Sequence, residues 1–192
     1  MGRVVALPVR PRRQPLLPNA VLGMLLFVLA EVMLFAGLIS AFLVVKGLAV
    51  EWPPVGQPRL PAEETAVNTA ALLLSGAVLA LAQRRFRAAP LRALRPLIAA
   101  VGLGGFFVVF QGVEWVALLR EGLTLTSSAH GGFFYLIVGL HALHAVAAIL
   151  ALGWAALRLA EGRLGQETFA AVQVFWYFVV GLWPILYWQV YF

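Results

Sequence analysis

The sequence predicts an all-α membrane protein, a bundle of about five transmembrane helices with a cytoplasmic N-terminus and an external C-terminus. Three observations predict this fold class. The chain of 192 residues is 62% hydrophobic and only 11% charged, which leaves too little polar surface to face water. Its apolar runs are long and lack the alternation of barrel strands, so helices must satisfy the backbone polar groups in lipid. The basic residues lie in short patches between these runs.

Five apolar segments are long enough to cross a hydrocarbon core of about 30 Å at a rise of about 1.5 Å per residue. They are residues 19–46, 65–82, 96–119, 131–157 and 168–191. Together, residues 19–192 are predicted to form one transmembrane bundle, preceded by a basic cytoplasmic segment, residues 1–18. This segment resembles the start of a signal peptide, but the apolar run after it has no convincing cleavage site. We therefore expect a retained first span.

The loop charges predict the orientation of the bundle. Eleven Arg lie at the N-terminus and in the connections after the second and fourth spans, whereas the remaining connections carry only Lys46, Arg59 and Arg120. Because basic loops stay in the cytoplasm, this asymmetry predicts a cytoplasmic N-terminus. The net charge of +6 does not indicate nucleic-acid binding, since no soluble basic face is visible.

Glu31 is the strongest sign of a polar site, because it lies within the apolar stretch 29–35 of the first span. It is about 12 residues, or about 18 Å, from the inner end of that span. The fourth span runs the opposite way and places His144 at nearly the same depth, with His141 one turn further outward on the same helix face. An unpaired carboxylate at this depth is costly, so we predict a hydrogen bond between Glu31 and His144.

Several roles are open to this buried polar cluster of Glu31, His141 and His144. The simplest is that the three side chains join helices by hydrogen bonds. A proton relay or proton buffer is the second interpretation. A metal site is disfavoured because no fourth ligand is evident and the chain has no Cys. Haem ligation by one of the His is compatible with a bundle, but no sequence feature distinguishes it from a structural role.

Other polar and small residues are predicted to serve packing. Glu114, with Gln111 one turn earlier, falls near the outer end of the third span and is expected to be solvated or to anchor a loop. Polar groups in the second span and glycines in the fourth should allow helices to pack closely. These residues are Asn68, Thr69, Ser75, Gly131, Gly132 and Gly139. No nucleophile elbow, phosphate loop or catalytic carboxylate pair appears, so no substrate site is predicted in this chain.

Five short motifs, in order along residues 25–192, resemble those of subunit III of the haem-copper oxidases. The resemblance is to the five-helix bacterial form, which lacks the first two helices of longer members. The motifs are AEVMLFAG at 30–37, the Trp52-Pro53-Pro54 loop with Asn68-Thr69, QGVEW at 111–115 with GLT at 122–124, GGFF at 131–134, and GLHALH at 139–144. The last two, which contain Gly131, Gly139, His141 and His144, are the most specific.

The resemblance implies a non-catalytic subunit of a terminal oxidase complex in a bacterial inner (plasma) membrane. Such a subunit binds no redox metal itself and packs against the catalytic subunit I, which holds the haem and copper, with subunit II also expected in the complex. It also implies bound phospholipid in a cleft near Glu31 and His144, and support of proton uptake during oxygen reduction in aerobic electron transport. The chain would then be part of an oxidoreductase without a catalytic site of its own.

Three residues differ from the family pattern. Many members have His and Asp in the last span where this sequence has Tyr177 and Val180, and Tyr where it has His130. Relatives of subunit III also accompany quinol oxidases and nitric-oxide-reducing enzymes, so an accessory subunit of either is an alternative. A small proton-coupled transporter or channel that uses Glu31 and His144 is another.

Overall fold

The computed structural model describes residues 17–192, so most of the basic segment predicted at 1–18 lies outside the described residues. The described chain folds into five long α-helices and one short 3-10 helix. They are α1 (Asn19–Leu48), α2 (Ala62–Ala88), η1 (Pro90–Ala93), α3 (Leu94–Arg120), α4 (Ala129–Ala160) and α5 (Gln166–Tyr191). All five α-helices are long and apolar enough to cross a membrane, which confirms the predicted fold class. The orientation of the termini stays a prediction.

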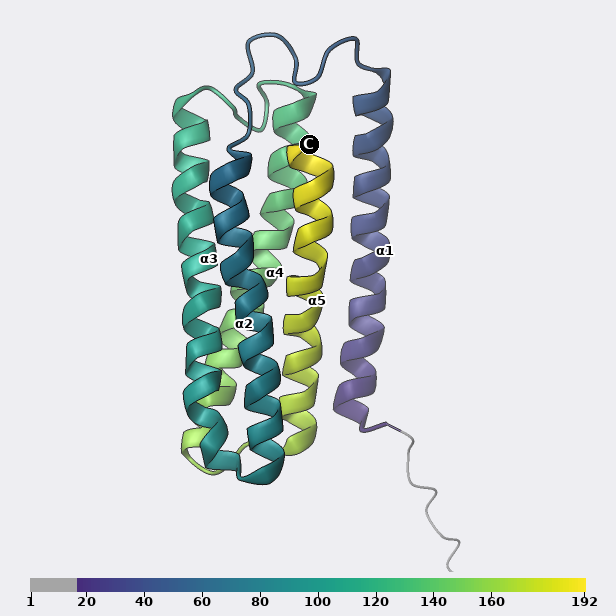
Figure 1. The fold of residues 1–192 in the computed structure, drawn as a ribbon. Coiled ribbons are helices and arrows are strands. Elements are labelled where there is room, and N and C mark those ends of the chain that lie inside the picture. Colours follow the sequence, from purple (N-terminus) through teal and green to yellow (C-terminus); the bar gives the residue numbers. More distant parts are fainter. Residues whose placement is uncertain (1–16) are drawn as a thin grey trace, which may run out of the picture.

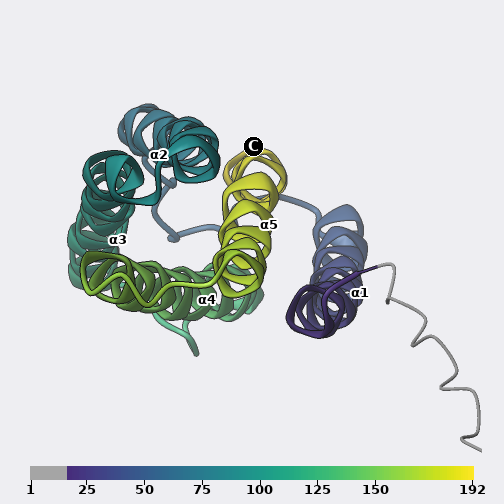
Figure 2. The same cartoon turned by 90° about the horizontal axis from the view of Figure 1, so that it is seen from below.

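The helices α2, α3, α4 and α5 contact one another in a closed ring, and α1 stands outside it against α5 and α4 (Figures 1 and 2). The view along the bundle shows α1 beside α5 and apart from α2 and α3 (Figure 2). Only Phe35 and Phe42 of α1 are buried within the chain. Most of α1 is therefore free to face lipid or another protein.

The second helix is longer than its predicted span of 65–82, because α2 begins at Ala62 and ends at Ala88. Its first turn carries Glu63 and Glu64, and its last turn carries Arg85 and Arg87. These charges stabilise the positive and negative ends of the helix dipole, respectively. Hydropathy detects only the apolar stretch, whereas the backbone hydrogen bonds continue into the charged turns.

The ends of α3 and α4 share a Schellman motif. At the end of α3, the N–H of Gly122 donates to the carbonyl of Leu119, and the N–H of Leu123 donates to that of Leu118. Gly122 has a φ of 93°, a left-handed conformation that glycine adopts without steric cost. The corresponding bonds at the end of α4 use Gly162 and Arg163. Both connections can therefore turn sharply into the next antiparallel helix.

Polar side chains join the helices of the ring. Asn68 Nδ2 donates to the carbonyl of Phe107 at 3.1 Å, and Ser75 Oγ donates to that of Ala100 at 2.9 Å. Thr69 Oγ1 accepts a hydrogen bond of 2.8 Å from Trp183 Nε1 of α5. These three contacts confirm the predicted role of the α2 polar residues in helix packing. Such bonds contribute about 0.6–2 kcal/mol each in a membrane protein.

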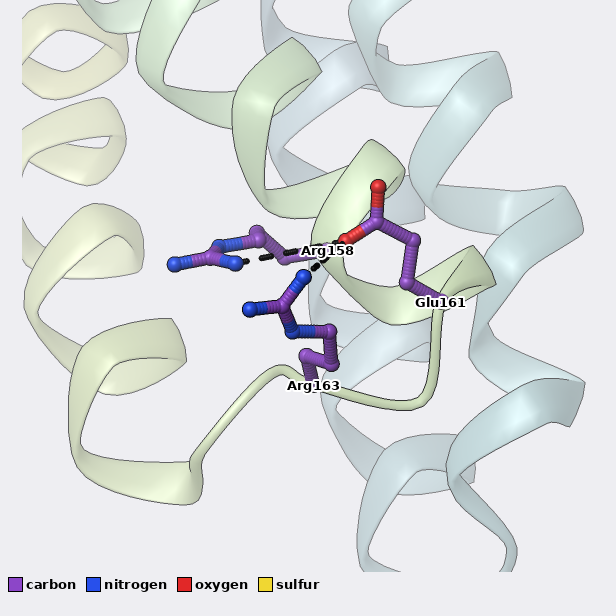
Figure 3. Close-up of polar contacts among 3 residues, drawn as sticks. All are labelled: Arg158, Glu161 and Arg163. Carbon is purple, nitrogen blue, oxygen red and sulfur yellow. Dashed lines mark hydrogen bonds and ion pairs between the residues drawn. The ribbon is translucent and has the colours of Figure 1, made fainter.

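The end of the bundle where α2 and α4 finish, here called the arginine-rich end, has a strong excess of positive charge. Its described residues include seven Arg and only two acidic residues, Glu161 and Glu167. Glu161 Oε2 lies 4.0 Å from Arg158 Nη1 and 3.5 Å from Arg163 Nη1 (Figure 3). These side chains are exposed, so the two contacts add little to stability.

Candidate functional site

Glu31 of α1 and His144 of α4 lie in contact, as their predicted depths require. Oε2 of Glu31 is 3.1 Å from Nε2 of His144. Neither side chain is open to the surroundings, since Glu31 is 16% and His144 is 10% exposed. The direction from the ring nitrogen to the oxygen departs from that of an ideal hydrogen bond, so we describe the pair as a close polar contact.

The other nitrogen of the His144 ring limits the roles open to Nε2. Nδ1 lies 2.8 Å from the carbonyl oxygen of Leu140, one turn earlier in α4. A carbonyl only accepts, so Nδ1 must carry a hydrogen. Nε2, the nitrogen that faces Glu31, can then accept from a protonated carboxyl group or, when it also carries a hydrogen, donate to a carboxylate.

The pair is enclosed by aromatic rings, which make its surroundings apolar. The imidazole of His144 lies within 6.4 Å of the ring centroids of four phenylalanines from α1 and α5. They are Phe27, Phe35, Phe175 and Phe178. An isolated charge is costly in such apolar surroundings. A charged Glu31 or a charged His144 is therefore less costly when the other group lies beside it than when it stands alone.

His141 does not join Glu31, although it lies one turn along α4 from His144. It is 1% exposed and stacks on Trp183 with ring centroids 5.0 Å apart. The rings of Phe35 and Phe107 contact it edge-on. Neither of its ring nitrogens has a hydrogen-bond partner among the described residues. The predicted cluster is therefore one polar pair plus a separate imidazole packed among aromatic rings.

Glu114 is buried, so the expectation that it is solvated or anchors a loop was wrong. It is 7% exposed, and its Oε2 accepts a hydrogen bond of 2.8 Å from Gln111 Nε2. Thr65 Oγ1 of α2 lies 3.0 Å from the same oxygen, and Gln111 also contacts the hydroxyl of Tyr191 in α5 at 3.2 Å. The carboxyl group turns inward because the Glu114 face of α3 looks into the ring of helices, where Thr65 of α2 bonds to it directly and Tyr191 of α5 bonds to Gln111. It joins three helices rather than a loop.

The motif residues Trp52 and Pro53 lie near the first turn of α4. The Trp52 ring packs edge-on against Phe42 at 5.5 Å and against His130 at 5.1 Å. The connection between α1 and α2 is thereby held against α4. Pro53 lines the same small pocket as His130.

The glycines of α4 do not all have the predicted role. A Cβ on Gly131 or Gly132 would meet the backbone of the α3–α4 connection rather than a neighbouring helix. Only Gly139 faces a helix, with the Trp115 ring of α3 at 3.6 Å from its Cβ position, an ordinary contact. The helix glycine with the least space is Gly104 of α3, where a Cβ would meet the Trp176 ring of α5 at 2.6 Å. No sequence motif marked Gly104.

The family resemblance implies a lipid cleft near Glu31 and His144 without naming its walls, and the structure has a groove between α1 and α5. It has a volume of about 380 Å³ and is almost entirely apolar. Phe35 and Phe178, which also contact His144, form part of its wall. Small residues, Ala36 of α1 and Gly181 of α5, also line it. The groove thus lies beside the rings that enclose the Glu31–His144 pair.

The sequence matches the family profile of cytochrome c oxidase subunit III over residues 17–192. The chain belongs to this family. It is 31% identical over 184 residues to a probable cytochrome c oxidase subunit 3 of Nocardia farcinica, covering 91% of this chain and 89% of the relative. It is 29% identical over 174 residues to cytochrome c oxidase subunit 3 of Thermostichus vulcanus, covering 87% and 84%. The same subunit of Lycodon semicarinatus is 32% identical over 179 residues, covering 88% of this chain and 67% of the relative.

Two departures of this subunit III family member lie one turn apart in α5 and contact different helices. Tyr177 lines the apolar groove with α1. Val180 is buried, and its Cγ1 would lie only 3.1 Å from a Cβ added to Gly76 of α2. The valine therefore fills a tight contact between α2 and α5 without needing a polar partner.

The Glu31–His144 pair of this subunit III family member predicts different results for two substitutions. Glu31→Gln keeps the shape and a hydrogen-bonding group, so the protein should still fold and assemble. Glu31→Ala leaves His144 Nε2 without a partner and should lower the free energy of unfolding by about 1–2 kcal/mol. Thermal unfolding in detergent would measure both variants, with Glu51→Ala in the exposed α1–α2 connection as the control. A Glu31→Ala variant as stable as the control would contradict the pairing.

Proposed function

We propose that the chain is the non-catalytic subunit III of a haem-copper terminal oxidase complex in a bacterial plasma membrane. The observation that carries this proposal is the family match over the whole described chain, residues 17–192. The exposed surface of α1 supports it, because apolar side chains such as Met33, which is 69% exposed, are available to a partner or to lipid. We infer that the partners are the catalytic subunit I and subunit II.

The haem and copper of the complex would belong to the catalytic partner. Within residues 17–192, no group of three or more His, Cys, Asp or Glu side chains is arranged to hold a metal ion. Two of the three imidazoles of α4 have surroundings unlike those of a metal ligand, since His144 contacts Glu31 and His141 is enclosed by aromatic rings. These surroundings support the proposal that the redox metals belong to the partner.

We infer that the groove between α1 and α5 holds an acyl chain of a phospholipid. Its apolar walls and volume of about 380 Å³ suit a hydrocarbon chain rather than a polar ligand. A lipid here would lie beside Phe35 and Phe178, and so beside the rings that pack on His144. Bound lipid would thereby exclude water from the Glu31–His144 pair.

Support of proton uptake would come from a proton held between Glu31 and His144. The pair could take up or release one proton while its partners stay in contact, which limits the cost of a transient charge in apolar surroundings. It would act as a local buffer for the catalytic subunit and not as a channel. His141, the next titratable group along α4, has no polar partner among the described residues that could continue a relay.

Two other functions remain as alternatives. A subunit of a quinol oxidase or of a nitric oxide reductase would use the same packing and lipid surfaces. A proton-coupled transporter would use the Glu31–His144 pair by itself. The names of the relatives favour the cytochrome c oxidase assignment over both.

Purification of the chain from its native membrane tests the assignment. We expect a haem-containing catalytic subunit to copurify, visible as haem absorption bands that change on reduction. Oxygen consumption with reduced cytochrome c, compared with a quinol, would then identify the electron donor. The isolated chain in liposomes should show no proton flux. Proton flux through the chain alone, without haem proteins, would contradict the proposal and favour the transporter.

A further inference from the structure

A second pocket lies at the end of the bundle opposite the arginine-rich end, where α1 and α5 finish and α4 begins. Its volume is about 150 Å³, the size of a small polar group rather than of a hydrocarbon chain. Lys46, Arg59 and His130 are its basic lining residues, and no acidic side chain lines it. Neither Lys46 nor Arg59 forms an ion pair with a carboxylate of the described residues. The side chains that line the pocket therefore carry a net positive charge, which suits an anion.

His130 provides an independent indication that a ligand binds here. Its side chain is 1% exposed, and neither ring nitrogen has a hydrogen-bond partner among residues 17–192. The ring is held edge-on by Trp52, with centroids 5.1 Å apart. Buried imidazole nitrogens normally have a hydrogen-bond partner. Because both nitrogens of His130 lack one and the ring lines a basic pocket, we infer that a bound ligand supplies it.

The first turn of α4 adds to the positive potential of the pocket. His130 is the second residue of this 32-residue helix, whose N-cap Ser128 accepts a hydrogen bond from the N–H of Gly131. A helix N-terminus has a partial positive charge and favours anions. The helix dipole, two cationic side chains and a buried imidazole thus act together on one small volume.

The position of the pocket identifies the kind of anion. It lies between the ends of the two helices that also form the apolar groove, with Lys46 seven residues after Ile39 of α1 and Val190 five residues after Ile185 of α5. Seven helical residues span about 10 Å. We propose that the pocket binds the phosphate of an anionic phospholipid whose acyl chain lies in the groove. The proposal rests on the lipid binding proposed above, because the two pockets would hold two ends of one molecule.

Arg59→Gln tests the headgroup site, because Arg59 is exposed in a connection and its loss should not impair folding. The native complex, purified in detergent and depleted of lipid, would be titrated with phosphatidylglycerol and phosphatidylcholine, and bound lipid counted by native mass spectrometry. We expect the affinity for phosphatidylglycerol to fall at least about fivefold, since a charge-assisted bond is lost. His130→Phe, which keeps the ring on Trp52, should also lower it. Arg120→Gln removes a charge outside the pocket and should not.

A groove variant separates this proposal from the lipid binding on which it rests. Gly181 lines the groove with open space around its Cβ position, so Gly181→Leu should fill the groove without a clash. It should lower the binding of both phospholipids. If Gly181→Leu lowers binding and Arg59→Gln does not, the headgroup site is wrong and the lipid groove stands. If Gly181→Leu changes neither lipid, lipid binding in the groove is wrong.

Two further results would overturn the headgroup site. If Arg120→Gln loses as much affinity for phosphatidylglycerol as Arg59→Gln does, the loss comes from the overall charge of the protein and not from the pocket. Inorganic phosphate is the second probe. If it binds with the same dependence on Arg59 while phosphatidylglycerol does not bind, the pocket takes a free anion instead of a lipid.

Discussion

Trp183→Ala should lower the free energy of unfolding by about 3–5 kcal/mol, the largest effect that we expect from one substitution. The side chain is fully buried, stacks on His141 and packs edge-on against Phe107 at 4.9 Å. Its Nε1 donates to Thr69 Oγ1 at 2.8 Å and so joins α5 to α2. Removal of the indole would leave a cavity between α5 and the side chains of α2, α3 and α4 that contact it. The buried hydroxyl of Thr69 would also lose its hydrogen-bond donor.

Thermal or denaturant unfolding in detergent, followed by circular dichroism, would measure this loss. Trp188→Ala is the matched control, because Trp188 lies in the same helix and is 65% exposed. Trp183→Phe keeps an aromatic ring but loses the hydrogen bond and part of the buried volume, so its cost should lie below that of Trp183→Ala. Equal losses in Trp183→Ala and Trp188→Ala would show that burial against His141 and Phe107 does not stabilise the bundle.

Gly131→Ala should destabilise the protein by about 1–3 kcal/mol or more, because the added methyl group has no space. Its Cβ would overlap the carbonyl oxygen of Thr124 and lie 2.9 Å from Ser127 Oγ. The obstacle is backbone, which cannot rotate away as a side chain could. The α3–α4 connection would have to move, and the first turn of α4 with its Ser128 cap would move with it.

The neighbouring glycine supplies the control for this prediction. A Cβ on Gly132 would meet only the Leu125 carbonyl, at 3.3 Å, so a shift of a few tenths of an ångström would relieve it. Gly132→Ala should therefore cost much less than Gly131→Ala in the same unfolding measurement. A reversed order would mean that the α3–α4 connection is free to move away from α4.

The contact between Glu31 and His144 could be predicted from the sequence because depth in a membrane helix depends on few quantities. A helix rises about 1.5 Å per residue, and consecutive spans run in opposite directions. Counting from the span ends therefore places both residues at one height. The same counting placed Glu114 near an outer end of the third span. It could not show that the carboxyl group of Glu114 turns inward to Thr65 of α2 and to Gln111.

The fold class, the five helices, the family and the height of each polar group along the bundle follow from the sequence alone. Which groups at similar heights meet depends on the packing of the helices. This packing sets His141 against Trp183 and not Glu31, and it forms the walls of the groove and of the basic pocket. The reason is physical. Hydrophobicity and helical rise act along the chain, whereas the rotation of a helix about its axis depends on side chains that lie far away in sequence.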